Sequence, residues 1–126
     1  MTSARKPAAA TLLLLFTLSS CSLPFGAGET ELRFRNVSSH DYRDFTYRSG
    51  GETLHFASIP SGAVTEYRVI DRSYRYGFVE LYVGDRRFVL QPIDYVGEET
   101  LGGGQFTFRV TVDTTSAFGV GLELEP

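Results

Sequence analysis

Cysteine is nearly absent from this chain. Its 126 residues include one cysteine, Cys21, and no tryptophan. A single cysteine excludes an intramolecular disulfide, so a folded domain here depends on its own hydrophobic core. A domain of about 100 residues buries roughly 65% of the surface of its unfolded chain, which is enough for such a core. An unpaired cysteine that directly follows an apolar stretch needs another explanation, and the residues before it supply one.

The chain also lacks an apolar run long enough for a membrane-spanning helix. Its longest apolar stretch covers residues 8–18, about half of the roughly 20 residues that such a helix requires. Arg5 and Lys6 stand just before it. A positive start followed by a short apolar stretch is typical of a secretory signal peptide. We therefore expect a signal peptide over residues 1–20 and export of the remainder.

The four residues that close this stretch are Leu18-Ser19-Ser20-Cys21. They resemble the lipobox of bacterial lipoproteins, in which an aliphatic residue and two small residues precede an obligatory cysteine. The resemblance covers only the leader. It implies cleavage between Ser20 and Cys21 and a diacylglycerol thioether on Cys21. An ordinary signal peptide with an incidental cysteine is the alternative.

A lipidated cysteine would place the protein on the outer surface of a membrane. Residues 21–28 then form the lipidated cysteine and a short tether rich in glycine and proline. Ser22 rather than aspartate follows the cysteine, and lipoproteins of this kind usually reach the outer membrane. We expect a lipid-anchored, extracytoplasmic protein, on the periplasmic face of the outer membrane if the host has two membranes.

Positive charge is scarce beyond the leader. Lys6 is the one lysine, and without Arg5 and Lys6 ten arginines oppose 15 acidic residues, a formal charge of −5. An acidic surface repels the phosphates of nucleic acid and of anionic lipids. We therefore expect no nucleic-acid partner. We expect the lipid on Cys21 to anchor the protein to the membrane.

Apolar and polar residues alternate along the remainder of the chain, and no window shows the 3.6-residue period of an amphipathic helix. This pattern is typical of short, half-buried β-strands. Strands are predicted at residues 32–34, 45–47, 54–56, 64–70, 74–83, 87–90, 106–112 and 118–124.

Turn residues separate these strands. Gly50-Gly51 and Gly84-Asp85 are typical of two-residue hairpins, Pro60 and Gly62 mark a turn, and Pro92 ends a strand because it lacks a backbone N–H. Short strands at this spacing predict a single all-β domain over residues 29–126. We expect an antiparallel β-sandwich of the immunoglobulin or fibronectin type, and a closed eight-stranded barrel is the alternative.

Few residues indicate catalysis or metal binding. His40 and His55, the two histidines, lack metal-ligand spacing to each other or to Cys21. The run Ser38-Ser39-His40-Asp41 contains the residue types of a hydrolytic triad, but triads converge from distant segments. We interpret this run as a polar turn.

Two groups of carboxylates remain as weaker candidates. Asp41 and Asp44, with Glu29 or Glu52, are candidate ligands of a loop calcium site but lack the dense aspartate spacing of known loops. Asp94, Glu98 and Glu99 offer the carboxylates that glycoside cleavage requires, in a chain too small to expect a deep cleft. We expect no enzyme activity, no metal and no cofactor.

The segment 74–83 is the most informative. One set of alternate positions carries Val79, Leu81 and Val83, which suits a core. The other set carries tyrosines, with arginines close by, and these residue types are enriched at binding hot spots. The candidate binding surface consists of Tyr74, Tyr76, Tyr82, Arg86 and Arg87. The alternative is that the connection of residues 93–101 covers this face.

These observations favour a non-catalytic interaction module of the cell envelope, anchored through Cys21. Its partner would be an envelope protein or polymer. The alternative is a lipoprotein that binds a small ligand or a carbohydrate through the face rich in tyrosine and arginine, because a tyrosine row can stack against sugar rings.

Overall fold

The computed structural model describes residues 28–92, 99–116 and 118–126. The predicted signal peptide, Cys21 and the tether up to residue 27 lie outside these ranges. None of the described residues belongs to a helix long and apolar enough to cross a membrane. The strands are β1 (Thr30–Asn36), β2 (Tyr42–Ser49), β3 (Glu52–Ile59), β4 (Arg68–Ile70), β5 (Phe78–Val83), β6 (Arg86–Leu90), β7 (Gly104–Val112) and β8 (Val120–Leu124).

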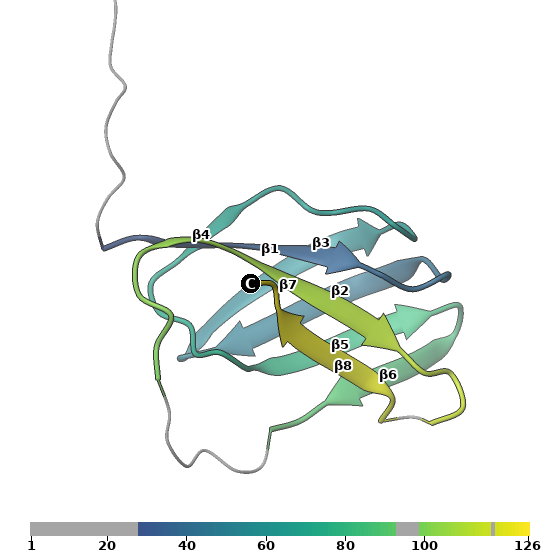
Figure 1. Cartoon of the computed structure of the whole chain (residues 1–126). Coiled ribbons are helices and arrows are strands. Elements are labelled where there is room, and N and C mark those ends of the chain that lie inside the picture. Colours follow the sequence, from purple (N-terminus) through teal and green to yellow (C-terminus); the bar gives the residue numbers. More distant parts are fainter. Residues whose placement is uncertain (1–27, 93–98, 117) are drawn as a thin grey trace, which may run out of the picture.

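The strands form two four-stranded sheets that pack face to face (Figure 1). One sheet has the order β4-β1-β7-β8, and the other has the order β3-β2-β5-β6. The domain is therefore an all-β sandwich, as the alternation predicted, and its eight strands do not close into one barrel. Each sheet contributes one apolar face to a shared core, because side chains alternate across a strand.

One strand pair contradicts the expectation of a wholly antiparallel sandwich. β1 and β7 run parallel over seven paired positions, from Thr30 beside Gly104 to Asn36 beside Val110. Parallel neighbours cannot be joined by a tight turn, and here the five other strands β2 to β6 lie between them in sequence. Alternation reveals which face of a strand is buried but not the direction of its neighbour, so the sequence contained no signal for this pairing.

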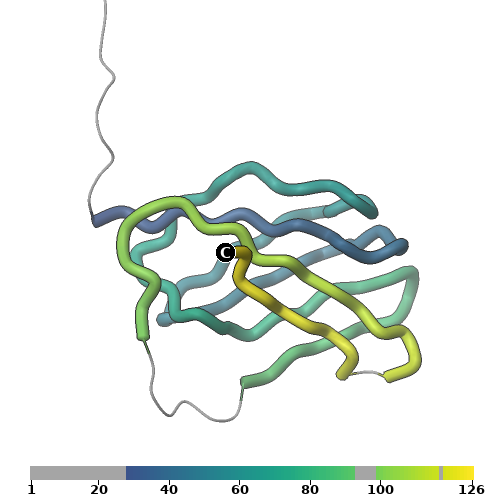
Figure 2. The backbone as a smooth tube through the Cα atoms, in the orientation of Figure 1, coloured from purple at the N-terminus to yellow at the C-terminus, as the bar shows by residue number. Residues whose placement is uncertain are grey.

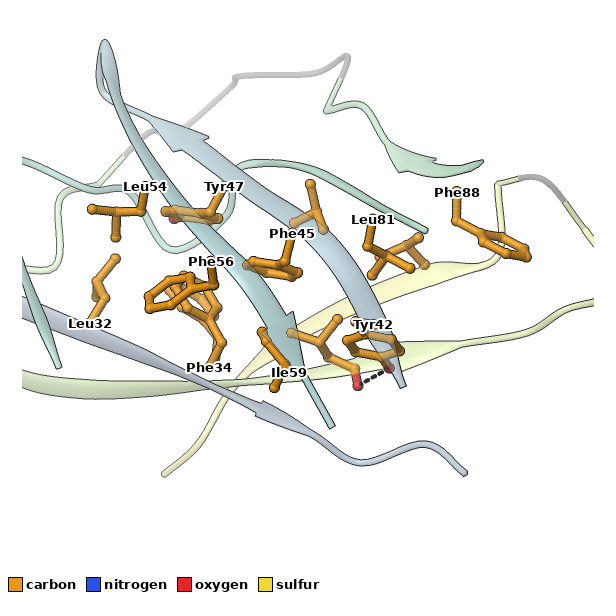
Figure 3. Packing of buried hydrophobic residues seen from close by; sticks show 14 of the residues in the cluster. Leu32, Phe34, Tyr42, Phe45, Tyr47, Leu54, Phe56, Ile59, Leu81 and Phe88 are labelled. Carbon is orange, nitrogen blue, oxygen red and sulfur yellow. Dashed lines mark hydrogen bonds between the residues drawn. The ribbon is translucent and has the colours of Figure 1, made fainter. Parts of the chain in front are cut away.

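An aromatic cluster fills the centre of the core. Phe34 of β1 is fully buried, and its ring centroid lies 4.9 Å from that of Phe45 and 5.0 Å from that of Tyr47. The rings of Phe56 and Phe108 lie 5.7 and 5.8 Å away. Figure 3 shows the labelled rings of Phe34, Phe45, Tyr47 and Phe56 between the layers. It also shows Tyr42, whose hydroxyl donates a 2.8 Å hydrogen bond to the backbone oxygen of Val110. The cluster therefore joins four strands at one point, β1 and β7 of one sheet and β2 and β3 of the other.

The predicted hairpin turns are confirmed. Gly50 and Gly51, between β2 and β3, both have positive φ, 62° and 84°, as a type I′ turn requires. Between β5 and β6 only Gly84 has positive φ, 60°, which fits type II′. A glycine is needed at these positions because other residues rarely adopt positive φ.

The strand predicted from Tyr74 is four residues too long. β5 begins at Phe78, and Tyr74 makes only an isolated bridge to Thr100. Residues 71–77 carry the chain from the end of β4 in one sheet to β5 in the other. Gly77 is packed so closely there that an added Cβ would stand 2.5 Å from the ring of Tyr47. The alternation of residue types continues through residues 74–77, although this segment crosses between the sheets and forms little regular strand pairing. The strand was therefore predicted to start too early.

Two other predicted strands are also shorter than expected. β4 begins at Arg68 rather than Val64, although Val64 forms an isolated bridge to Arg35. β8 begins at Val120 rather than Phe118, and the side chain of Phe118 is 79% exposed. The backbone N–H of Asp113 donates to the oxygen of Gly119, which closes the loop just before β8 starts.

The two ends of the sandwich differ. Gly28, the start of β1 and the Gly50-Gly51 turn lie at one end, which we call the entry end. Loops 37–41, 60–63 and 84–85 gather at the opposite end, with the described residues 113–116 and 118–119 of the loop before β8 (Figure 2). Any segment that reaches the domain through Gly28 therefore attaches opposite these four loops.

Candidate binding site

The five residues of the candidate surface separate into three places. Tyr74 and Tyr76 stack on each other near the entry end, with ring centroids 5.9 Å apart and ring planes 19° apart. Tyr82 and Arg87 are direct cross-strand neighbours on β5 and β6. Arg86 precedes Arg87 on β6, so its side chain lies on the other face of that strand. Its guanidinium lies 4.7 Å over the Phe88 ring and donates to the oxygen of Thr114.

Tyr74, Tyr76 and Tyr82 are each half-buried. Most of the connection expected to cover them, residues 93–98, lies outside the described residues. Of its remaining residues, Leu101 packs against the core. The single tyrosine row therefore becomes two separate surfaces, each with its own support.

Buried hydroxyls hold the backbone of the tyrosine pair, Tyr74 and Tyr76. The Ser49 hydroxyl accepts the N–H of Tyr74 at 3.0 Å and donates to the backbone oxygen of Tyr76 at 2.9 Å. The Ser73 hydroxyl donates to the oxygen of Tyr74 at 2.9 Å and lies 2.7 Å from the Tyr47 hydroxyl. Segment 73–76 is therefore fixed by groups on β2 and within the segment itself.

These hydroxyls are removed from solvent. Ser49, Ser73 and Tyr47 are 6%, 1% and 0% exposed, so their hydrogen bonds are made in a low-dielectric interior, where they are costly to break. Burial raises the pKa of Tyr47 above 10.0, and the phenol stays protonated at neutral pH. Its contribution to stability is complete below pH 10.0 and is lost as the pH rises through the raised pKa.

A cleft of about 190 Å³ opens beside the tyrosine pair. Its lining includes both tyrosines, Phe78, Arg48 and Gln91. The Arg48 guanidinium lies 4.4 Å over the Phe78 ring, and no ion pair found among the described residues involves it. We call this site the tyrosine cleft.

Two larger hollows have a different character. One of about 460 Å³, at the entry end, is lined by small and charged residues that include Glu52, Asp71 and Arg72 but no aromatic ring. The other, of about 620 Å³, has Arg33, Arg75 and Glu125 around a single ring. Of the three, only the tyrosine cleft combines several aromatic rings with a cation and no carboxylate among the described residues.

A second surface lies on the outer side of the β3-β2-β5-β6 sheet. Arg43 of β2, Tyr82 of β5 and Arg87 of β6 stand side by side in the strand register. The Arg43 guanidinium lies 5.1 Å over the Tyr82 ring, and Arg87 donates to Glu80 at 2.5 Å. That hydrogen bond raises the pKa of Arg87. We call Arg43, Tyr82 and Arg87 the arginine–tyrosine face.

A β-bulge shapes this face. Pairing of β2 with β5 shifts register between Arg43 and Thr46, and Asp44 within the bulge has a φ of 50°. Positive φ is uncommon for a residue with a side chain, and bulges re-aim the side chains beside them. The Asp44 carboxylate accepts a 2.7 Å hydrogen bond from Arg43 and lies 4.0 Å from His55.

The weaker candidates of the sequence are dispersed. Asp41 accepts the N–H of Ser61 at 2.9 Å and thereby joins two loops, whereas Asp44 pairs with Arg43. Glu99 lies 3.5 Å from Arg75, and Asp94 and Glu98 are outside the described residues. Within residues 28–92, 99–116 and 118–126, no three His, Cys, Asp or Glu side chains are grouped as metal ligands.

Sequence reasoning missed the residues that support both surfaces. Arg48 and Ser49 precede the Gly50-Gly51 turn, and only the strand register brings them to segment 73–78. Arg43 likewise reaches Tyr82 through β2 to β5 pairing. The turn glycines were the nearest available signal, because they located the hairpin but not its neighbours.

Comparisons with known proteins reveal the fold only. No protein-family model and no curated protein matches the chain. Among solved structures, the chain is similar to one described as "NMR structure of the protein from Eubacterium rectale". The two share 12% sequence identity with a TM-score of 0.54, over 80% of this chain and 92% of that one. The likeness supports the all-β sandwich.

Removing the Ser73 hydroxyl tests the support of the tyrosine pair. Ser73→Ala removes the donor to the Tyr74 oxygen and leaves the buried Tyr47 hydroxyl only its longer 3.3 Å bond to the Tyr76 oxygen. We therefore expect a loss of about 1–3 kcal/mol in the free energy of unfolding, measured in urea. Ser58→Ala, at an exposed position of β3, should change it by less than about 0.5 kcal/mol. Equal effects of the two substitutions would contradict a supporting role for Ser73.

Proposed function

We propose that this chain is a bacterial lipoprotein, anchored outside the cytoplasm by lipid on Cys21, whose β-sandwich is a non-catalytic interaction module of the cell envelope. The leader with its Leu18-Ser19-Ser20-Cys21 motif supports the anchor. The seven residues after Cys21, 22–28, would reach at most about 25 Å when fully extended. The partner, an envelope protein or polymer, would therefore be met close to the bilayer.

The arginine–tyrosine face carries this proposal. Tyrosine and arginine dominate binding hot spots because each combines a large contact area with hydrogen bonding. The side chains of Arg43 and Arg87 are 53% and 55% exposed, yet both are already held in place. Arg43 is held by Asp44 and over the Tyr82 ring, and Arg87 is held by Glu80. Side chains that are ordered before binding lose less entropy when a partner docks.

A second candidate function, binding of a small ligand or a carbohydrate, is favoured by the tyrosine cleft. The rings of Tyr74 and Tyr76 stack on each other and line the cleft, and buried hydroxyls fix the backbone that carries them. Small-molecule sites are typically concave, with aromatic walls and a few polar groups. The cleft has these properties on a scale suited to a small ligand.

Partner binding by wild type and by a Tyr82→Ala variant tests the interaction-module function. Native lipoprotein and a Tyr82→Ala variant are used to capture partners from envelope membranes and to sediment purified envelope polymer. We expect the partner to bind the variant about 30-fold more weakly, as at a hot-spot tyrosine. Arg109→Ala, which removes an exposed arginine from the other sheet, is the matched control and should bind normally.

The decisive comparison is between these two variants rather than capture itself. A partner that binds wild type and Arg109→Ala but not Tyr82→Ala supports the arginine–tyrosine face. If all three proteins capture the same partners, the arginine–tyrosine face is not the binding surface.

A further inference from the structure

We infer that the tyrosine cleft binds one acidic sugar ring, such as a uronic acid unit of a polysaccharide. The inference rests on the second candidate function and specifies its ligand class. It arises from three properties of the cleft: stacked aromatic rings, an arginine without an ion pair among the described residues, and a volume of about 190 Å³.

The aromatic wall suits a sugar. The Tyr74 and Tyr76 rings lie nearly parallel, and Phe78 adds a third ring to the lining. A pyranose ring has a C–H face that packs against such a surface, while its hydroxyls point outward to polar groups. Burying an apolar face against aromatic carbon is favourable in proportion to the area removed from water.

The charge of the cleft indicates an anionic ligand. Arg48 is exposed and is held over Phe78, and no carboxylate among the described residues lines the cleft. A guanidinium binds a carboxylate through two parallel hydrogen bonds, which are stronger than neutral ones. Six of the ten described arginines pair with acidic side chains. Of the others, Arg33 and Arg72 line hollows that contain carboxylates, whereas the described lining of the tyrosine cleft contains Arg48 and no carboxylate.

The remaining groups match a single ring with hydroxyls. The Gln91 amide, which donates one hydrogen bond to the oxygen of Pro92, keeps further hydrogen-bonding capacity toward the cleft. Gly51 leaves the rim open, because an added Cβ would meet nothing within 4 Å. Drug-sized ligands occupy pockets of about 300–1,000 Å³, so 190 Å³ admits one ring rather than a buried oligomer. A polymer would place one unit in the cleft and extend past Gly51.

Matched saccharides test this inference. The native lipoprotein in detergent micelles is titrated by calorimetry with trigalacturonate and with its fully methyl-esterified form, which keeps the rings and removes the charge. We expect trigalacturonate to bind at least about tenfold more tightly, as a charge-assisted hydrogen-bonded pair requires. Arg48→Gln should lose this preference and bind both forms with the weaker affinity.

Controls separate this site from the other surface. Arg87→Gln, on the arginine–tyrosine face, should bind both saccharides as wild type does. Equal binding of acid and ester by wild type, an unchanged preference in Arg48→Gln, or no binding of either saccharide would each overturn the inference. Partner capture through Tyr82 is measured separately, so a failure here is distinguishable from a failure of the interaction module.

Discussion

Replacing Cys21 with serine should abolish incorporation of labelled fatty acid into the protein and leave an uncleaved precursor. Under the proposed lipidation, the lipid would join Cys21 through a thioether, for which serine offers no sulfur, and the precursor would then not be processed as a lipoprotein. Two or three acyl chains give stable anchoring, because each buried methylene contributes about 0.8 kcal/mol. The variant should therefore be missing from the processed, lipid-labelled fraction of the membrane.

A substitution one residue earlier provides the control. Ser20→Ala keeps a small residue before the cysteine, so labelling and cleavage should both continue. Both are read from a gel of metabolically labelled cells, in which precursor and processed protein differ by about twenty residues. Label that persists in Cys21→Ser would contradict lipidation of Cys21. Wild type that is cleaved but carries no label would mean that the leader is an ordinary signal peptide.

Replacing Phe34 with alanine should destabilise the domain by about 3–5 kcal/mol. Phe34 is fully buried and contacts rings from β2, β3 and β7, so its loss opens a cavity between the two sheets. Domains of this size are stabilised by only about 5–15 kcal/mol. The loss is therefore a large share of the total, and it is measured as a shift of the urea unfolding midpoint.

Two further variants keep this prediction testable if Phe34→Ala does not fold. Phe34→Leu retains much of the volume and should cost less than about 1.5 kcal/mol. Phe118→Ala removes a phenylalanine that is 79% exposed and should change stability by less than about 0.5 kcal/mol. If Phe118→Ala were as damaging as Phe34→Leu, the core would be misplaced.

Much of the fold was predictable from local pattern. The alternation around Phe45 and Tyr47, and again around Phe108 and Val110, predicted strands whose apolar residues are buried in the structure. The Gly50-Gly51 turn was predictable because its positive φ values nearly require glycine. Each of these predictions depends only on residues adjacent in sequence. For this reason the structure contains the predicted strands and turn.

The candidate site was only partly predictable. Tyr74, Tyr76 and Tyr82 were identified by residue type, but alternation placed them on one face. The crossing at Gly77, where the chain changes sheets, separates the first two from the third. Arg48 and Ser49, which complete the tyrosine cleft, carried no signal because their role depends on which strand lies beside β2.

The amino-acid sequence by itself determined the all-β class, the buried positions of most strands and the two hairpin turns, because side-chain polarity and glycine conformation act locally. Only the tertiary structure decided the rest: the parallel pairing of β1 with β7, the true start of β5 and the division of the tyrosines between two surfaces. Those features depend on which strands meet across the sandwich, and pairing between distant segments leaves no trace in the period of a single strand.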